Sequence, residues 1–325
     1  MSSEPGRQVA EWRIRPYSGS VADAEGILAV ERATFCECPY TAEVLQTRLQ
    51  RPEQRAWIAE AGGQVIGFLS GICTPRVTGP TLEADLLAVH PAWQRQGIAT
   101  ALLVALRRDA AQGHAVVLRS VVRPENAASE RAFARAGFVP SAGIYDLLIY
   151  RILGTAPRPL PAWGGEIGPL AGPDEAAQLA QWIPPGVPVQ AVDSPMGSPA
   201  ERLWAACRQG ASGCMRGDGV PALTVLAARH DSAVVAAAEF VEVHTLLYAG
   251  LWLESLLLGP QGRPARKALI AAAVEWAKSR DLDEVGCLVP ERDHPLRAAL
   301  REEGFVPLDH YRTWSAAPLA DGGRP

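Results

Sequence analysis

The chain has 325 residues, which exceeds the size of one average hydrophobic core and predicts two domains. Hydrophobic residues make up 48% of it and charged residues 20%, a balance that excludes an intrinsically disordered chain. The formal net charge is −4 and no run of Lys and Arg occurs, so neither nucleic acid nor an anionic membrane surface is expected as the main partner.

The sequence carries no sign of export, of a membrane span or of a metal site. Residues 1–15 contain no apolar stretch of the kind that secretory signals need. The most apolar segment, 234–259, is interrupted by three glutamates and a histidine, which favours strands of a packed core over a membrane span. Cys36 and Cys38 form a C-x-C pair without a second pair at zinc spacing. We therefore expect a cytoplasmic protein with reduced thiols, no metal and no membrane contact.

Hydrophobic periodicity predicts a mixed α/β order for the first half of the chain. Two alternating segments are joined by Gly62 and Gly63, a hairpin signal, and Thr41 is placed to cap the N-terminus of a helix. The expected elements in chain order are strand 12–16, helices 21–34 and 41–49, strands 55–60, 65–74 and 82–89, helix 97–111, strand 115–122, helix 127–136 and two strands within 138–152.

An internal repeat organises the chain. Three landmarks recur in the same order: residues 14–16 are echoed by 167–169, 86–91 by 256–260, and 122–140 by 289–307, where both copies end in Gly-Phe-Val-Pro. Matches in one order indicate two copies of one domain fold. A proline-rich segment separates the copies and is typical of a semi-rigid linker. The sequence therefore predicts a first domain at 1–154, a linker at 155–163 and a second domain at 164–325.

The segment 91–99 follows an apolar strand and opens a helix at Gly97. The first amides of a helix lack intrahelical partners, and the helix dipole adds positive potential there, so this turn is suited to hold a phosphate group. Glycine at 97 lets the backbone approach a bulky anion, and Ala99 keeps the next position small. The Gly-Lys-Ser/Thr signature of nucleotide hydrolases is missing from this turn.

These residues resemble the GNAT acetyltransferase superfamily. Its motif Q/R-x-x-G-x-G/A is met by Gln94, Gly97 and Ala99, after a strand that ends in Leu-Ala-Val-His-Pro, and the later asparagine, helix and Gly-Phe block at 126–138 is also similar. The resemblance covers the first copy fully and the second more weakly. It implies an α/β fold of two tandem GNAT-like domains, each a mixed, mostly antiparallel sheet flanked by helices, and acetyl-CoA as cosubstrate.

The resemblance also implies which residues bind the cofactor. The backbone N–H groups of five consecutive residues would hold its pyrophosphate, namely Gln96, Gly97, Ile98, Ala99 and Thr100. The side chains of Gln94 and Arg95 would flank that group. The strand edge at Leu87, Ala88 and Val89 would pair with the pantetheine arm and polarise the thioester carbonyl, and Asn126 would hydrogen-bond the thiol end.

For the chemistry, Glu83 and Asp85 are the candidate general bases, because residues two apart on a strand share a face. Many members of the superfamily carry a tyrosine, proposed to protonate the departing thiolate, where this chain has Phe133. Here the departing thiolate has to be protonated by a water or by another side chain, or it leaves unassisted. Tyr145 and Tyr150 on the final strands are two candidates for that proton donor.

The second copy looks degenerate in the corresponding turn. Aligning Gln94 with Arg263 puts Arg266 in the place of Gly97 and Pro264, which has no amide N–H, in the place of Arg95. We expect this copy not to bind acetyl-CoA. The contrary interpretation uses three basic side chains as phosphate ligands: Arg263, Arg266 and Lys267.

We therefore expect an acetyl-CoA-dependent N-acetyltransferase, a monomer or homodimer, that acts on a primary amine of a small molecule. A protein or peptide N-acetyltransferase is the first alternative, since 31–35 and 39–41 are similar to the type that acetylates ribosomal proteins. That type's glutamate falls on Val121 and its tyrosine on Phe133, and both departures weaken the match. A non-catalytic acyl-CoA-binding module is the second alternative.

Overall fold

A computed structural model of the chain describes residues 11–35, 40–74, 80–115, 117–152, 163–182, 223–259 and 261–319. The first half follows the element order predicted from periodicity. Its elements are β1 (Trp12–Pro16), α1 (Val21–Thr34), α2 (Ala42–Leu49), β2 (Gln54–Ala61), β3 (Gln64–Thr74), β4 (Thr81–Val89), the short helix η1 (Pro91–Trp93), α3 (Ile98–Asp109), the π-turn η2 (Ala110–His114), β5 (Val117–Val122), α4 (Ala127–Arg135), β6 (Val139–Pro140) and β7 (Tyr145–Arg151). Thr41 caps α2, as its position predicted.

The second half follows a similar order in its described elements, with one helix before β9 and one long strand at the end. Its described elements are β8 (Glu166–Pro169), α5 (Pro173–Trp182), β9 (Leu223–His230), β10 (Ala233–His244), β11 (Ala249–Leu258), α7 (Ala265–Ser279), β12 (Glu284–Pro290), α8 (His294–Glu302) and β13 (Val306–Ala316). The C-x-C pair and nearly all of the predicted linker 155–163 lie outside the described residues. The division into 1–154 and 164–325 therefore stays a prediction.

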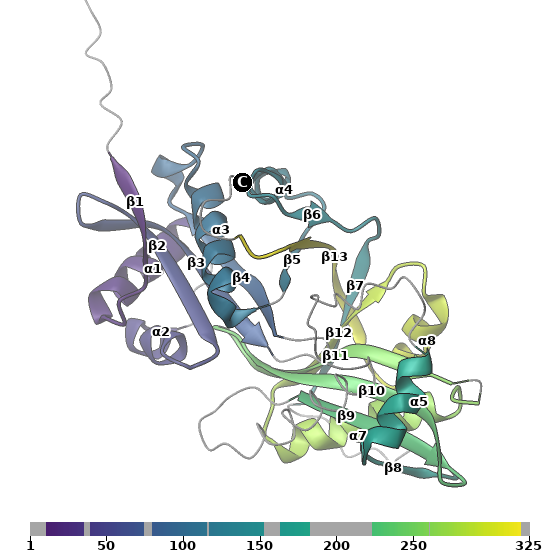
Figure 1. Cartoon of the computed structure of the whole chain (residues 1–325). Helices are drawn as coiled ribbons and strands as arrows, with labels where there is room; N and C mark the ends of the chain where they lie inside the picture. Colours follow the sequence, from purple (N-terminus) through teal and green to yellow (C-terminus); the bar gives the residue numbers. More distant parts are fainter. Residues whose placement is uncertain are drawn as a thin grey trace, which may run out of the picture.

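All the strands of the described chain join one sheet, and their order reads as a near palindrome. Starting from one edge, the strands run β1-β2-β3-β4-β5-β13-β7-β12-β11-β10-β9-β8, with β6 paired to β13. In each half the first four strands are antiparallel and the fourth pairs in parallel with the fifth. The internal repeat seen in the sequence is thus a structural repeat (Figure 1).

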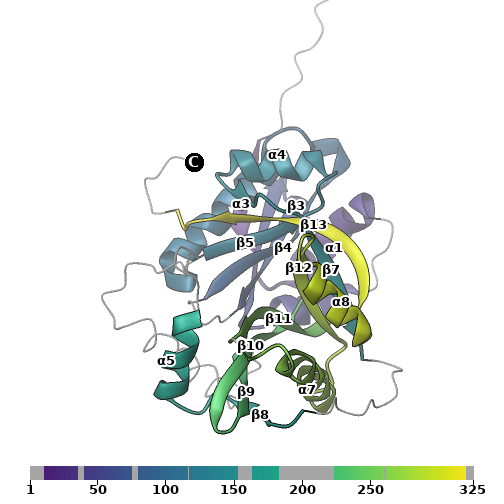
Figure 2. The same cartoon turned by 90° about the vertical axis from the view of Figure 1, so that its right-hand side faces the viewer.

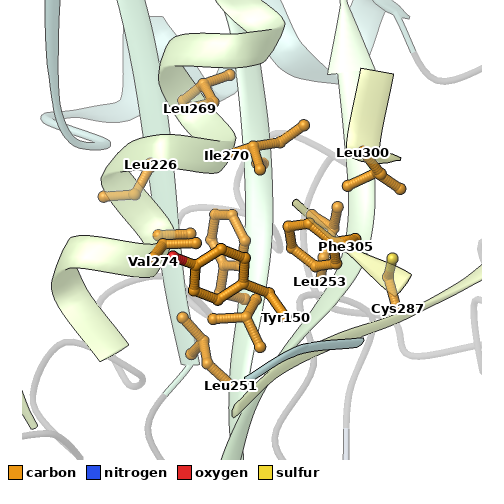
Figure 3. Close-up of a cluster of buried hydrophobic side chains, with 14 of the residues drawn as sticks. Tyr150, Leu226, Leu251, Leu253, Leu269, Ile270, Val274, Cys287, Leu300 and Phe305 are labelled. Atoms are coloured by element: carbon orange, nitrogen blue, oxygen red, sulfur yellow. The ribbon is translucent and has the colours of Figure 1, made fainter. Parts of the chain in front are cut away.

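The two halves exchange their last strands. β7, from the first half, lies against β12 of the second half, whereas residues 312–316 of β13 pair with β5 of the first half (Figure 2). Tyr150 of β7 consequently belongs to the second-half core, where its ring lies 5.6 Å from that of Phe305 (Figure 3). Neither half completes its own sheet.

Helices cover both faces of the first-half sheet. α3 and α4 cover the face on which Leu82 and Ala84 of β4 are buried. α1 and α2 cover the opposite face, where Ala88 is buried and to which Leu86 packs. The side chains of Glu83 and Asp85, which lie between or beside those inward residues, therefore face away from α3.

The turn between β10 and β11 inserts into the first half. Leu246 at its tip is fully buried in the cluster beneath α1 and α2. Arg48 donates a hydrogen bond to the carbonyl of Leu246, and Gln54 Nε2 donates one to the carbonyl of His244 at 2.6 Å. This turn places second-half residues directly beside β4.

Within the described ranges, no helix is long and apolar enough to cross a membrane. The same ranges hold no cluster of His, Cys, Asp and Glu suited to a metal ion.

Strand exchange predicts that a chain ending at residue 163 cannot fold stably, because β5 would keep an unpaired edge and β7 would lose both neighbours. We expect this fragment to be aggregated or to lack a cooperative thermal transition by circular dichroism. Coexpression with residues 164–325 should restore a soluble complex. A fragment that melts cooperatively by itself would contradict the structure.

Candidate active site

The candidate site begins where β4 and β5 diverge. Their parallel pairing covers only residues 81–84 of β4, so residues 85–89 have no neighbour on that edge. On the other edge, the pairing of β4 with β3 shifts register between Leu69 and Gly71, so Ser70 has no partner in the strand register. The Oγ of Ser70 instead accepts a hydrogen bond from the Leu86 amide at 3.1 Å. This bulge bends β4 away from β5 and opens a cleft.

The divergence leaves main-chain donors on the open edge. The His90 amide donates to the Ile66 carbonyl of β3 at 2.9 Å. Because N–H groups of an antiparallel strand point to alternate edges, the amides of Leu87 and Val89 point the other way, into the cleft. This edge can pair with an extended amide-containing ligand.

The turn before α3 supplies a second set of donors. Arg95 and Gly97 both have a positive φ, 65° and 84°. Among the described hydrogen bonds, none uses the amides of residues 95–100, and the first closing bond of α3 is Ala101 N–H to the Gly97 carbonyl at 3.0 Å. The first-turn amides are therefore free to bind an anion.

Two side chains hold this turn in place. Gln94 Nε2 donates to the Val89 carbonyl at 3.1 Å and so ties the turn to the end of β4. His90 Nδ1 accepts a hydrogen bond from the Ala92 amide at 3.3 Å, which caps η1. A Cβ placed on Gly97 would meet no protein atom within 4 Å, so the space beside this residue is open.

These features line one cleft of about 590 Å³. It brings together ten of the eleven predicted cofactor residues: Leu87, Ala88, Val89, Gln94, Arg95, Gly97, Ile98, Ala99, Thr100 and Asn126. Gln96 is exposed in the same turn without lining the cleft. Asn126 Oδ1 caps α4 by accepting from the Ser129 amide at 3.1 Å, which leaves its side-chain NH₂ for a ligand.

Sequence reasoning missed two basic residues of the cleft, Arg131 and Arg135 on α4. Together with Arg95 they give the lining three guanidinium groups, and no carboxylate is among the lining residues. In a chain with a net charge of −4, this local excess of positive charge suits a polyanionic ligand. Helical spacing from Asn126 could have found both, since Ala128, Arg131 and Arg135 fall on one face.

Neither of the two candidate tyrosines lines this cleft. Phe133, in the place of the family's tyrosine, is buried in the first-half core with its ring 5.0 Å from that of Phe138. Tyr150 is buried in the second-half core. Tyr145 lines a separate cavity between the halves.

Asp85 is half-buried in an acidic setting at the junction of the halves. Its Oδ2 is shielded from solvent and has no hydrogen-bond partner among the described residues. Burial, together with the nearby charges of Glu83 and Glu31, raises the pKa of Asp85 to about 7, against the opposing effect of the hydrogen bond from the Leu246 amide. Asp85 therefore exchanges a proton near neutral pH.

Glu83 has a different environment. Its Oε2 accepts two hydrogen bonds from Arg119 of β5, at 2.9 and 2.6 Å. The same guanidinium binds both oxygens of Glu254 on β11, at 3.0 and 3.2 Å. Glu83 is thus part of an ion cluster that joins the two halves.

The corresponding turn of the second half differs in its hydrogen bonding. The Ala265 amide donates to the Gly262 carbonyl at 3.1 Å, and the Arg266 amide to the Arg263 carbonyl at 3.3 Å. Lys267 is paired with Glu302. The start of α7 therefore offers fewer free donors than the start of α3.

Comparisons with known proteins agree with this geometry. Residues 8–138 match the family model described as Acetyltransferase (GNAT) family. A tandem GNAT protein from the clavulanic acid biosynthesis pathway is similar in fold, with a TM-score of 0.57 and 18% identity over 97% of this chain and 100% of that chain. A GCN5-related N-acetyltransferase from Sphaerobacter thermophilus gives a TM-score of 0.57 and 17% identity over 97% of each chain. No curated protein sequence matches. At these identities the solved structures show the fold alone, and the predicted tandem GNAT-like fold is confirmed.

A Gly97→Glu variant should lose measurable acetyl-CoA binding in calorimetry, because a carboxylate would enter the phosphate space. Gly63→Glu is the matched control, since Gly63 has nearly the same φ, 81° against 84°, and equally open surroundings in the β2–β3 hairpin. Both variants place a side chain on a residue with positive φ. Equal affinity of the two variants for acetyl-CoA would contradict the site assignment.

Proposed function

Because residues 8–138 match the GNAT acetyltransferase family model and the chain has a tandem GNAT-like fold, we propose that this protein is an acetyl-CoA-dependent N-acetyltransferase acting on the primary amine of a small molecule. The observation that carries the proposal is the cleft beside β4, where free main-chain donors and three arginines meet.

The cleft fits acetyl-CoA in chemistry. The amides at 96–100 and the guanidinium groups of Arg95, Arg131 and Arg135 suit the phosphates, and the open edge of β4 suits the amide-rich pantetheine arm. Acetyl-CoA supplies an activated thioester. The Leu87 or Val89 amide would donate to its carbonyl oxygen, a contact that would strengthen as negative charge develops there.

Asp85 is the base that the surroundings favour. An amine arrives as an ammonium ion and must lose one proton before its nitrogen can form the new C–N bond. A carboxylate with a pKa of about 7 can take that proton near neutral pH. The C–S bond then breaks, and the second amine proton ends on the departing thiolate, giving an amide and free CoA. Glu83 is paired with Arg119, so we assign it a structural part in the ion cluster and not the part of the base.

The second half supports a small acceptor. Glu83 and Asp85 face the β10–β11 turn and β11, so second-half residues cover the side from which the amine must approach. A peptide would need an open groove there, and no observation in the described residues favours it. Because Phe133 cannot donate a proton, a non-catalytic acyl-CoA-binding module is the remaining alternative. Measurable turnover distinguishes the enzyme from such a module.

Free CoA should be released when acetyl-CoA is mixed with a panel of small primary amines. We expect kcat/KM to rise with pH through about 7, since the base acts deprotonated and the Asp85 pKa lies there. Asp85→Asn should lower kcat/KM by roughly 10²–10⁴-fold and remove this pH dependence. Acetyl-CoA affinity should stay unchanged. Wild-type rates and pH profile in Asp85→Asn would overturn its assignment as base, and binding without turnover on any amine would overturn the enzymatic proposal.

Calorimetric titration should find one acetyl-CoA per chain. The turn at α7 uses its amides within the chain and places Arg266 where the first half has glycine. A stoichiometry of two would show that basic side chains of the second half replace the missing donors.

A further inference from the structure

The β10–β11 turn of the second half contacts the proposed base of the first half from across the junction. The turn reaches over to α2 and β2 (Figure 1), where Arg48 donates to the carbonyl of Leu246 and Gln54 Nε2 donates to the carbonyl of His244 at 2.6 Å. The side chain of Leu246 is fully buried in the cluster beneath α1 and α2. First-half side chains from two elements therefore hold this second-half turn.

Hydrogen bonds within the turn close it and leave one amide at its tip for another acceptor. The Thr245 amide donates to the Tyr248 carbonyl at 2.9 Å, and Thr245 Oγ1 accepts from the Leu247 and Tyr248 amides, both at 3.0 Å. The Leu246 amide has no described acceptor within the turn and donates to the carboxyl of Asp85. A donor on a closed and anchored turn is preorganised for the charge that it binds.

Arg48 acts at the same residue that holds Asp85. Its guanidinium donates to the carbonyl of Leu246, while the amide of Leu246 donates to the Asp85 carboxyl. Arg48 is half-buried and forms no ion pair among the described residues. Hydrogen bonds with a charged donor are stronger than neutral ones, so the loss of this contact should free the tip of the turn.

The carboxylates that face Asp85 from other elements act against its ionised form. Glu83, on the same strand, has the larger effect, although Arg119 of β5 is hydrogen-bonded to it at 2.6 Å. Glu31, which is buried on α1, has a smaller effect of the same sign. A like charge nearby always disfavours the second charge. Both groups therefore favour the protonated form of Asp85.

The turn also carries a titratable group, Tyr248, which adds no charge near neutral pH. Burial and the charge of Asp85 raise the pKa of Tyr248 well above its ordinary value, so its phenol stays protonated. Among the contacts described for Asp85, the Leu246 amide is thus the one that favours the ionised form.

Resting on the proposed function for the role of Asp85, we propose that the β10–β11 turn is a positioning element of the active site, and that Arg48 is a positioning residue that acts through the Leu246 amide to orient the base and stabilise its charged form. The second half then contributes to the reaction through a main-chain donor that the first half holds in place.

Carbon-detected NMR titration of the full chain measures the protonation of Asp85 without any substrate. Its carboxyl resonance is the one that disappears in Asp85→Asn. We expect Arg48→Met and Gln54→Met, which each release one anchor of the turn, to raise the pKa of Asp85 by roughly 0.5–1 unit, because two or three backbone donors together lower the pKa of a carboxyl by about 2 units. In the wild type, the Leu246 amide should shift with pH at the same midpoint as Asp85.

Three comparisons separate positioning from a simple change of charge. Gln54→Met leaves the charge of the chain unchanged, so a higher pKa in this variant cannot come from a lost cation. Arg51→Met is the matched control for Arg48→Met: it removes a charge three residues further along, makes no described hydrogen bond to the turn, and should leave the pKa of Asp85 nearly unchanged. Glu31→Gln removes a like charge and should lower that pKa.

The proposal is overturned if the Leu246 amide does not titrate with Asp85, a test that needs only the wild-type chain. It is also overturned if Arg48→Met and Gln54→Met leave the pKa of Asp85 where Arg51→Met leaves it.

Kinetics separates this proposal from the proposed function. With an amine that releases CoA, the acidic limb of kcat/KM should move to higher pH in Arg48→Met and Gln54→Met. An unmoved limb would overturn the positioning role while the acetyltransferase stands. The expected NMR shifts without turnover on any amine would support the contact and reject the acetyltransferase.

Discussion

The site depends on one constraint: β4 leaves its parallel partner β5 after Ala84 while remaining paired to β3. The amides of Leu87 and Val89 then have no strand partner, and the turn that follows exposes the first-turn amides of α3. A row of main-chain donors without protein acceptors at an open cleft can bind a ligand with matching acceptors. Gln94, bonded to the Val89 carbonyl, keeps the strand edge and the turn in register.

Charge is divided across this divergence. One side gathers Arg95, Arg131 and Arg135 without a lining carboxylate, and on the other side Arg119 binds Glu83 and Glu254, with Asp85 close to Glu83. A ligand rich in phosphate would meet complementary potential on the first side. The second half matters here in two ways, because its turn at Leu246 donates to Asp85 and its strand β11 supplies Glu254. Strand exchange fixes both contributions.

Much of the first half could be predicted from sequence, because local patterns determine it. Periodicity placed the helices and strands within a few residues, and the turn at 94–100 was recognisable from Gly97 and its neighbours. Strand exchange could not be predicted, since Tyr150 and Phe305 meet through pairing that no local pattern encodes. The environment of Asp85 could not be predicted either, because it depends on a contact with Leu246, which is distant in sequence. Helical spacing from Asn126 does predict Arg131 and Arg135 of α4 on the cleft face, although they were not among the predicted site residues.

Amide hydrogen exchange of the full chain, followed by NMR with and without CoA, tests the central claim most directly. Amides without intrahelical partners exchange fast in the free protein. The account predicts that CoA slows exchange at residues 96–100 and at Leu87 and Val89, with little change at the start of α7. Unchanged exchange at 96–100 in a chain saturated with CoA would contradict it.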